Sequence, residues 1–305
     1  MAMSLIAASG RATAQTVSGG GALPTSQSAS QSRAQAQPQM AKPQSATPST
    51  MGATTGQPTP SASASKIDLK EDAAYKAFYD VPPSKTDELI RQGEAFLLSY
   101  PASEYRELVY SRLAQAYIVK QNYSKMEEDG EKALALNSND VDALALLGWA
   151  IPHNYDPADP NAAARLQKAE DYLRRALQIL STLQKPATIS AEQFAQLSND
   201  RLSQVHSGLG LVYFRRGQYA QAVLGFRQAV KLASSPDPID LFVLGESLQQ
   251  IQQYGEAAAV YDQCGKIPNN FQLRCQDNSR QARQQAASQQ SSANHANAVQ
   301  SAAKP

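Results

Sequence analysis

The feature that most constrains the fold is a repeat of about 34 residues in the middle of the chain. Large residues stand at positions 4, 7 and 11 of each copy, Gly or Ala stands at position 8, and the copies begin at residues 107, 141, 203 and 238. Apolar residues recur at spacings of three and four, and no run alternates with period two, so the repeating unit is helical. A period of this length predicts stacked helical hairpins.

The small residue at position 8 indicates that two helices cross closely there. A glycine inside a helix costs about 1 kcal/mol relative to alanine, so Gly148, Gly210 and Gly245 need a packing reason. The second half of each copy has a small, a large and a small residue in turn. These residues interlock with the large residues at positions 4, 7 and 11 of the first half. We expect Gly217 to take a left-handed conformation in the turn between the two halves of the third copy.

Together these residues resemble the tetratricopeptide repeat (TPR) family over roughly residues 107–271. The resemblance implies an all-α fold, a right-handed α–α superhelix or solenoid, within residues 67–280. The expected units are a partial repeat at about 86–106, repeats at 107–140, 141–183 (with an insertion), 203–236 and 238–271, and a capping helix at 272–285.

The spacing between the second and third copies is 62 residues, which leaves 28 residues beyond one repeat. Nine fall inside the second copy, around the proline-rich stretch 152–160. The others precede the third copy, where Ser190 and Gln193 form a capping-box pattern that predicts the start of a long helix. Insertions in solenoids tend to emerge on one face, often the functional one.

Two polar tails flank the predicted solenoid. In residues 1–66, 54 positions are Ala, Ser, Thr, Gln, Pro or Gly, and no acidic or aromatic residue occurs. Such a segment cannot bury enough apolar surface to offset its conformational entropy, so we expect disorder. Residues 286–305 have a similar composition and are also expected to be disordered; a Gln/Ala helix that self-associates is the alternative.

The amino-terminal residues are compatible with an export signal. Residues 1–14 combine a mildly apolar run with Ala12-Thr13-Ala14, the small-x-small form of a signal-peptidase site. A chance pattern in an alanine-rich tail is the alternative. The segment 96–105 ends a predicted helix in Tyr-Pro-x-Ser, which is similar to a variant found in bacterial cell-envelope repeat proteins. We therefore expect an exported, periplasmic protein, with a cytoplasmic one as the alternative.

Charge and motifs exclude several classes of function. The whole chain carries a formal net charge of +1, and residues 67–280 hold 22 Lys and Arg against 27 Asp and Glu, so we expect no nucleic-acid partner. The longest apolar stretch has nine residues, and a membrane-spanning helix needs about twenty. No phosphate-binding loop or hydrolase motif occurs. We interpret His153 as a loop residue and His206 as a core residue rather than as catalytic residues. We expect no metal, no cofactor and no catalysis; an enzyme with a site in 152–202 is the remote alternative.

Two cysteines lie eleven residues apart at the end of the last repeat. Cys264 takes the small position of that repeat, and Cys275 falls early in the following helix, so the two can meet across a helical hairpin. In an exported protein we expect a disulfide, which would add roughly 3 kcal/mol of stability. In a cytosolic protein two small buried thiols are the expectation.

The resemblance also implies a concave groove lined by positions 2, 5, 9 and 12 of each first helix. The residues that we select as candidates for binding a partner are Gln115, Trp149, Leu211, Phe214, Phe242, Glu246 and Gln249. The Lys and Asn with which chaperone-binding members hold a terminal carboxylate are absent from these positions. Trp149, Phe214 and Phe242 are the candidate aromatic anchors for an extended peptide or a helix.

Alternatives remain for two of these anchors, because Trp149 can pack under the 152–160 insertion and Phe214 against the added helix. The predicted function is that of a non-catalytic scaffold that binds a protein or peptide partner. A structural envelope protein that works by self-association is the main alternative.

Overall fold

The computed structural model describes residues 69–268 and 270–302, and within these all regular secondary structure is α-helical. The predicted tail 1–66 and its signal-like segment 1–14 lie outside the described residues. The helices are α2 (Leu69–Tyr79), α3 (Thr86–Ser99), α4 (Arg106–Val119), α5 (Tyr123–Leu136), α6 (Val141–His153), α7 (Ala162–Thr182), α8 (Ala191–Arg215), α9 (Tyr219–Leu232), α10 (Pro238–Gln250), α11 (Tyr254–Lys266) and α12 (Gln272–Ala302).

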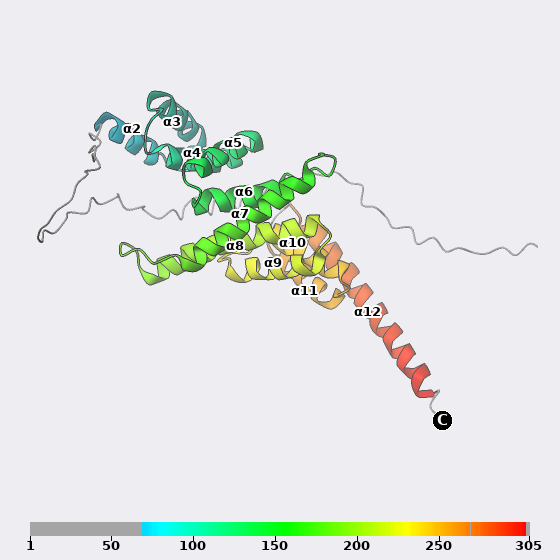
Figure 1. Ribbon diagram of the computed structural model, residues 1–305. Coiled ribbons are helices and arrows are strands. Elements are labelled where there is room, and N and C mark those ends of the chain that lie inside the picture. The colour runs from blue at the N-terminus through cyan, green and yellow to red at the C-terminus, as the bar shows by residue number, and fades with distance from the viewer. Residues whose placement is uncertain (1–68, 269, 303–305) are drawn as a thin grey trace, which may run out of the picture.

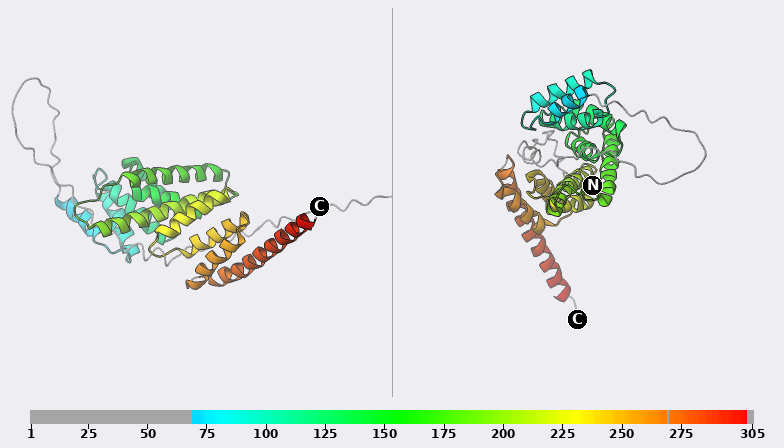
Figure 2. Two further views of the ribbon diagram at one scale, coloured as in Figure 1. Left: turned by 90° about the horizontal axis from the view of Figure 1, so that it is seen from below. Right: turned by 90° about the vertical axis from the view of Figure 1, so that its left-hand side faces the viewer.

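Consecutive helices pair as antiparallel hairpins, and each hairpin packs on the next (Figure 1). The hairpins are α2–α3, α4–α5, α6–α7, α8–α9 and α10–α11, and α12 closes the row. Seen from the side in Figure 2 (right), they follow one another around an arc rather than around one central core. This is the predicted all-α solenoid, and the α4–α5 to α10–α11 hairpins contain the four copies of the sequence repeat.

The glycine at position 8 lies at a close helix crossing, as predicted. A β-carbon built on Gly245 of α10 would stand 2.6 Å from the ring of Tyr261 in α11, and one built on Gly210 would stand 2.9 Å from the ring of Phe226 in α9. Both aromatic rings are fully buried. The large residue of each second helix therefore occupies the space that the missing side chain leaves.

The turns inside three hairpins repeat the same backbone geometry. Gly217 has a φ of +72°, and Gln121 and Gln252 take the left-handed conformation at the equivalent places, with φ of 56° and 61°. In each turn the residue that follows donates its backbone N–H to a carbonyl five residues earlier. The predicted left-handed conformation of Gly217 is confirmed, and two glutamines adopt it because the repeat requires that turn.

Helix starts are fixed by polar side chains. Ser190 and Gln193 form both hydrogen bonds of the predicted capping box, with distances of 3.1 and 2.9 Å, at the start of α8. Asp140 caps α6 and Asp237 caps α10. Because α8 begins at residue 191, it extends the first helix of the third repeat backwards by about three turns.

The buried apolar residues form two clusters that share α8. The first runs from α2 to α8 and includes Val205 and Val212, whereas the second runs from α8 to α12 and includes Leu211. Tyr213 packs against both clusters. One long helix therefore connects the amino-terminal and carboxyl-terminal halves of the solenoid.

A buried arginine ties the first hairpin to the next one. Arg112 of α4 donates its guanidinium hydrogens to the backbone oxygens of Phe78, Tyr79 and Val81, which end α2. The guanidinium also lies over the Phe78 ring, with 5.2 Å to its centroid. Burial lowers the pKa of Arg112. The carbonyls of Tyr79 and Val81 thereby gain a hydrogen-bond partner at and just beyond the end of α2, and the Phe78 carbonyl, which also accepts from the Val81 N–H, gains a second one.

The last helix is longer than the sequence analysis predicts. α12 begins at Gln272, close to the expected capping helix 272–285, but it continues to Ala302, where we expected a disordered tail from residue 286. The segment 272–302 contains no Gly or Pro and is rich in Ala and Gln, which favour helix. Figure 1 shows its second half projecting away from the hairpins.

Candidate partner-binding face

The first helices α4, α6, α8 and α10 lie next to one another, and we call the surface that carries positions 2, 5, 9 and 12 the first-helix face. Five of the seven predicted binding residues are half-buried on it. These five are Gln115, Trp149, Phe214, Glu246 and Gln249. They come from four successive first helices, so the structure brings side chains from separate repeats onto one face.

Leu211 and Phe242 do not belong to this face, and their selection as contact residues is corrected by the structure. Each is 1% exposed and lies in the second core cluster. Phe242 is covered by Phe271, with the ring centroids 5.6 Å apart, and by Arg274 of α12, 4.9 Å above the ring. The capping helix therefore covers a position that would be open in the interior of a longer solenoid.

The end of α6 and the loop after it contact two residues of the first helices, Trp149 and Arg215. The rings of Trp149 and His153 lie 4.0 Å apart, and Nδ1 of His153 is 2.6 Å from the Trp149 carbonyl oxygen. In the loop that follows, Tyr155 lies under the guanidinium of Arg215 at 5.4 Å. Trp149 is therefore stacked on the last residue of its own helix, and whether a partner contacts it stays a prediction.

Three charged side chains from different helices lie close enough for the charges of the two arginines to act on the carboxylate. Arg215 ends α8, Glu246 lies in the middle of α10, and Arg274 lies in the first turn of α12. Burial raises the pKa of Glu246, and the positive charges of Arg274 and Arg215 offset part of that rise. We call Arg215, Glu246 and Arg274 the charged cluster.

Both guanidinium groups of the charged cluster are held by aromatic rings. Arg215 lies over Tyr155 and donates its Nε hydrogen to the Pro152 carbonyl oxygen at 3.2 Å, while Arg274 lies over Phe242. Burial lowers the pKa of Arg215. Each ring attracts the guanidinium above it and leaves the N–H groups at the guanidinium edge as hydrogen-bond donors, and Arg274 is exposed.

A chain of polar contacts continues from α10 to α12. The hydroxyl of Tyr261 donates to Oε1 of Gln249 at 2.7 Å, and Nε2 of Gln249 donates to Oε1 of Gln285 at 3.0 Å. Gln249 is therefore already engaged in linking α10, α11 and α12. Its half-buried side chain serves first to position the capping helix.

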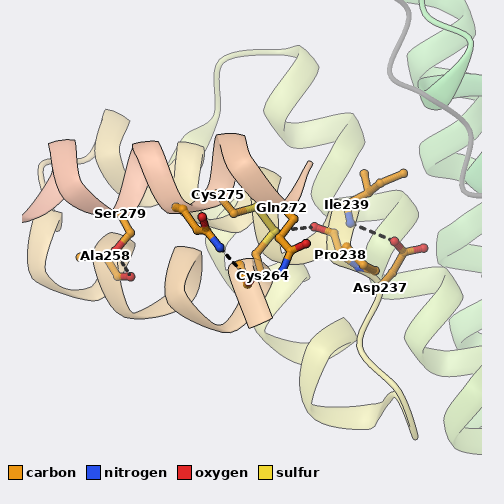
Figure 3. Close-up of a disulfide and its surroundings, with 10 residues drawn as sticks. Asp237, Pro238, Ile239, Ala258, Cys264, Gln272, Cys275 and Ser279 are labelled. Carbon is orange, nitrogen blue, oxygen red and sulfur yellow. Dashed lines mark hydrogen bonds between the residues drawn. A yellow bond between two sulfur atoms is a disulfide. The ribbon is translucent and has the colours of Figure 1, made fainter. Parts of the chain in front are cut away.

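A disulfide joins the last two helices. Cys264 of α11 and Cys275 of α12 are bonded, with their Cα atoms 5.8 Å apart, and both are fully buried (Figure 3). Nearby, Gln272 donates to the Gly265 carbonyl at 3.1 Å and Ser279 donates to the Ala258 carbonyl at 3.2 Å. The structure thus forms the bond that the sequence analysis expects of an exported protein, and it fixes α12 one residue from Arg274.

The two histidines considered as chemical candidates have structural surroundings. His206 is half-buried in α8, and burial lowers its pKa. His153 stacks on Trp149 at the start of the insertion. Across residues 69–268 and 270–302, no group of three or more His, Cys, Asp or Glu side chains is arranged to hold a metal ion.

The same described residues contain no helix that is both long and apolar enough to cross a membrane.

No protein-family model matches the chain, and no curated protein matches it either. The hairpins share the repeat spacing, a close crossing at a glycine and the same left-handed turn, so the chain is a row of repeated helical hairpins.

Two solved structures with similar helix arrangements are TPR proteins. One is TTC0263, a thermophilic TPR protein in Thermus thermophilus, with a TM-score of 0.46, 17% identity, and 70% of this chain and 98% of that chain covered. The other is the TPR domain of P58(IPK), with a TM-score of 0.30, 14% identity, and 70% and 65% of the two chains covered.

Sequence reasoning missed Arg215, Arg274 and Tyr155. Arg215 stands one position beyond the expected contact position 12, Arg274 belongs to the capping helix, and Tyr155 belongs to the insertion. A register taken from a regular repeat does not extend to a cap or an insertion. The pairing of each arginine with an aromatic residue from another segment carries no local signal.

Proposed function

We propose that this chain is a protein-interaction scaffold that holds a peptide or helix of a partner against its first-helix face. The observation that carries the proposal is the convergence of side chains from α8, α10 and α12 at the charged cluster. Stacked hairpins present such residues on a rigid, extended surface. Phe214 supports the same interpretation, because it is a half-buried aromatic residue on α8 next to Arg215.

The proposal includes export from the cytoplasm, and its support is the disulfide between Cys264 and Cys275. Disulfides persist in oxidising compartments and are rare in the cytosol. Fractionation of the native host, combined with mass spectrometry of the alkylated, non-reduced protein, tests this part. Protein recovered from the cytosolic fraction with two alkylated cysteines would contradict it.

Site-specific photocrosslinking tests the scaffold proposal. A benzoylphenylalanine replaces Phe214 on the first-helix face in one variant and Leu224 in a matched control, and the cross-linked proteins are identified from the native host. Leu224 lies on α9 and is 64% exposed, so it samples a surface outside the first-helix face. We expect a discrete cross-linked partner from position 214 alone, reproduced with the purified partner.

Equal cross-linking from both positions, or none from position 214, would refute the use of this face.

A further inference from the structure

The charged cluster has hydrogen-bonding capacity that the described chain does not use. Neither Arg215 nor Arg274 forms an ion pair with Glu246 or with any other carboxylate in residues 69–268 and 270–302. Glu246 accepts no hydrogen bond from those residues. Its half-buried carboxylate therefore lies near two positive charges without contacting either.

The balance of charge and donors at the cluster favours a negatively charged ligand group. An arginine has five N–H donors, and toward the part of the chain that the structure describes only Nε of Arg215 is used, by the Pro152 carbonyl. Two cations face one anion, so the cluster keeps an excess positive charge within a segment, 67–280, that is acidic overall. The planar edge of a guanidinium suits a two-pronged contact with a carboxylate.

From this arrangement we propose that Arg215 and Arg274 bind the side-chain carboxylate of an internal Asp or Glu in a partner segment, while the like charge of Glu246 opposes any carboxylate that does not contact the arginines. The proposal rests on the proposed scaffold function and names the chemistry of the partner. The neighbouring face, with Phe214, would contact the residues that flank the acidic side chain.

Fluorescence anisotropy with two synthetic peptides and the full chain tests the proposal. Both peptides carry a fluorophore, an acetylated amino terminus and an amidated carboxyl terminus, so that neither offers a terminal carboxylate. One contains several Glu residues in an Ala/Ser background, and the other contains Lys at the same positions. Non-specific attraction to the acidic segment 67–280 would favour the Lys peptide, so preference for the Glu peptide requires a local site.

We expect the Glu peptide to bind more tightly than the Lys peptide. Arg274→Gln should weaken its binding about tenfold, the loss of one charge-assisted contact, and Glu246→Gln should tighten it. Arg280→Gln is the matched control, because Arg280 lies on the same helix, is exposed and pairs with Asp277. An unchanged circular dichroism spectrum of the Arg274 variant would show that its weaker binding is not caused by a loss of folded structure.

Equal binding of the two peptides, tighter binding of the Lys peptide, or equal losses in the Arg274 and Arg280 variants would overturn the proposal. If position 214 still gives a cross-link, any of these outcomes refutes only the proposal of an acidic partner segment and not the proposed scaffold function. Absence of that cross-link would remove the scaffold function itself.

Discussion

Replacing Gly245 with alanine should destabilise the protein, although helix propensity alone predicts the opposite. Alanine is better than glycine inside a helix by about 1 kcal/mol. The added β-carbon, however, would stand 2.6, 2.7 and 2.8 Å from three ring atoms of Tyr261, where ordinary contacts are 3.4–4 Å. Tyr261 is fully buried and its hydroxyl donates a hydrogen bond to Gln249, so its ring has little room to move.

Overpacking of this kind costs about 1–3 kcal/mol. With Tyr261 fixed we take the upper part of that range, which leaves a net loss of about 2 kcal/mol after the gain in propensity. Gly255→Ala is the matched control, because the same β-carbon on α11 would meet nothing within 4 Å. It should stabilise the helix by roughly 0.5–1 kcal/mol.

Urea denaturation followed by far-ultraviolet circular dichroism measures both variants, and hydrogen exchange of α10 and α11 reports whether the change is local. Adding Tyr261→Leu should make the Gly245 substitution less costly, because the clashing ring atoms are removed. Stabilisation by Gly245→Ala equal to that of the control would refute the close crossing.

Three further predictions concern the other contacts. Burial, and then the charge of Asp140, raise the pKa of Glu107 to about 7. Ionisation of Glu107 therefore lowers the stability of the fold as pH rises from about 4.5 to about 7. The free energy of unfolding of Glu107→Gln should equal that of wild type at pH 4.5 and exceed it by about 1 kcal/mol at pH 8, as measured by thermal denaturation. A difference of the same size at both pH values would contradict this. Arg112→Met should cost about 3 kcal/mol and speed hydrogen exchange first in α2, and unchanged exchange there would contradict the role of its contacts. Replacing Cys264 and Cys275 with serine should lower the free energy of unfolding by roughly 3 kcal/mol in oxidising buffer and leave it close to that of reduced wild type in reducing buffer. If variant and wild type differ in stability by the same amount after reduction, the buried serines and not the lost bond are responsible.

Local patterns in the sequence were enough to predict the hairpins. Periodicity gave the helices, the glycine at position 8 gave the crossings, and Ser190 with Gln193 gave the start of α8, because each signal involves residues that lie close together in the chain. The pairing of Cys264 with Cys275 belongs to the same group, since both residues lie at predictable places on one hairpin.

The features that were not predicted depend on contacts between distant segments. Phe242 was chosen as an exposed anchor, but α12 covers it, and the position of α12 could not be inferred from the repeat register. The role of Arg112 depends on carbonyls that lie more than thirty residues away. Tyr155 and Arg215 meet only because the insertion folds back over α8.

The disulfide between α11 and α12 ties the last two helices together near the carboxyl-terminal end of the row of hairpins. In a row of hairpins that contact only their neighbours, the terminal units open most easily. Here the carboxyl-terminal unit is closed by a covalent link, and both cysteines of the chain are engaged in it. The bond closes residues 264–275 only, so α11 and the first turn of α12, which carries Arg274, stay joined even when the rest of α12 or the amino-terminal hairpins open.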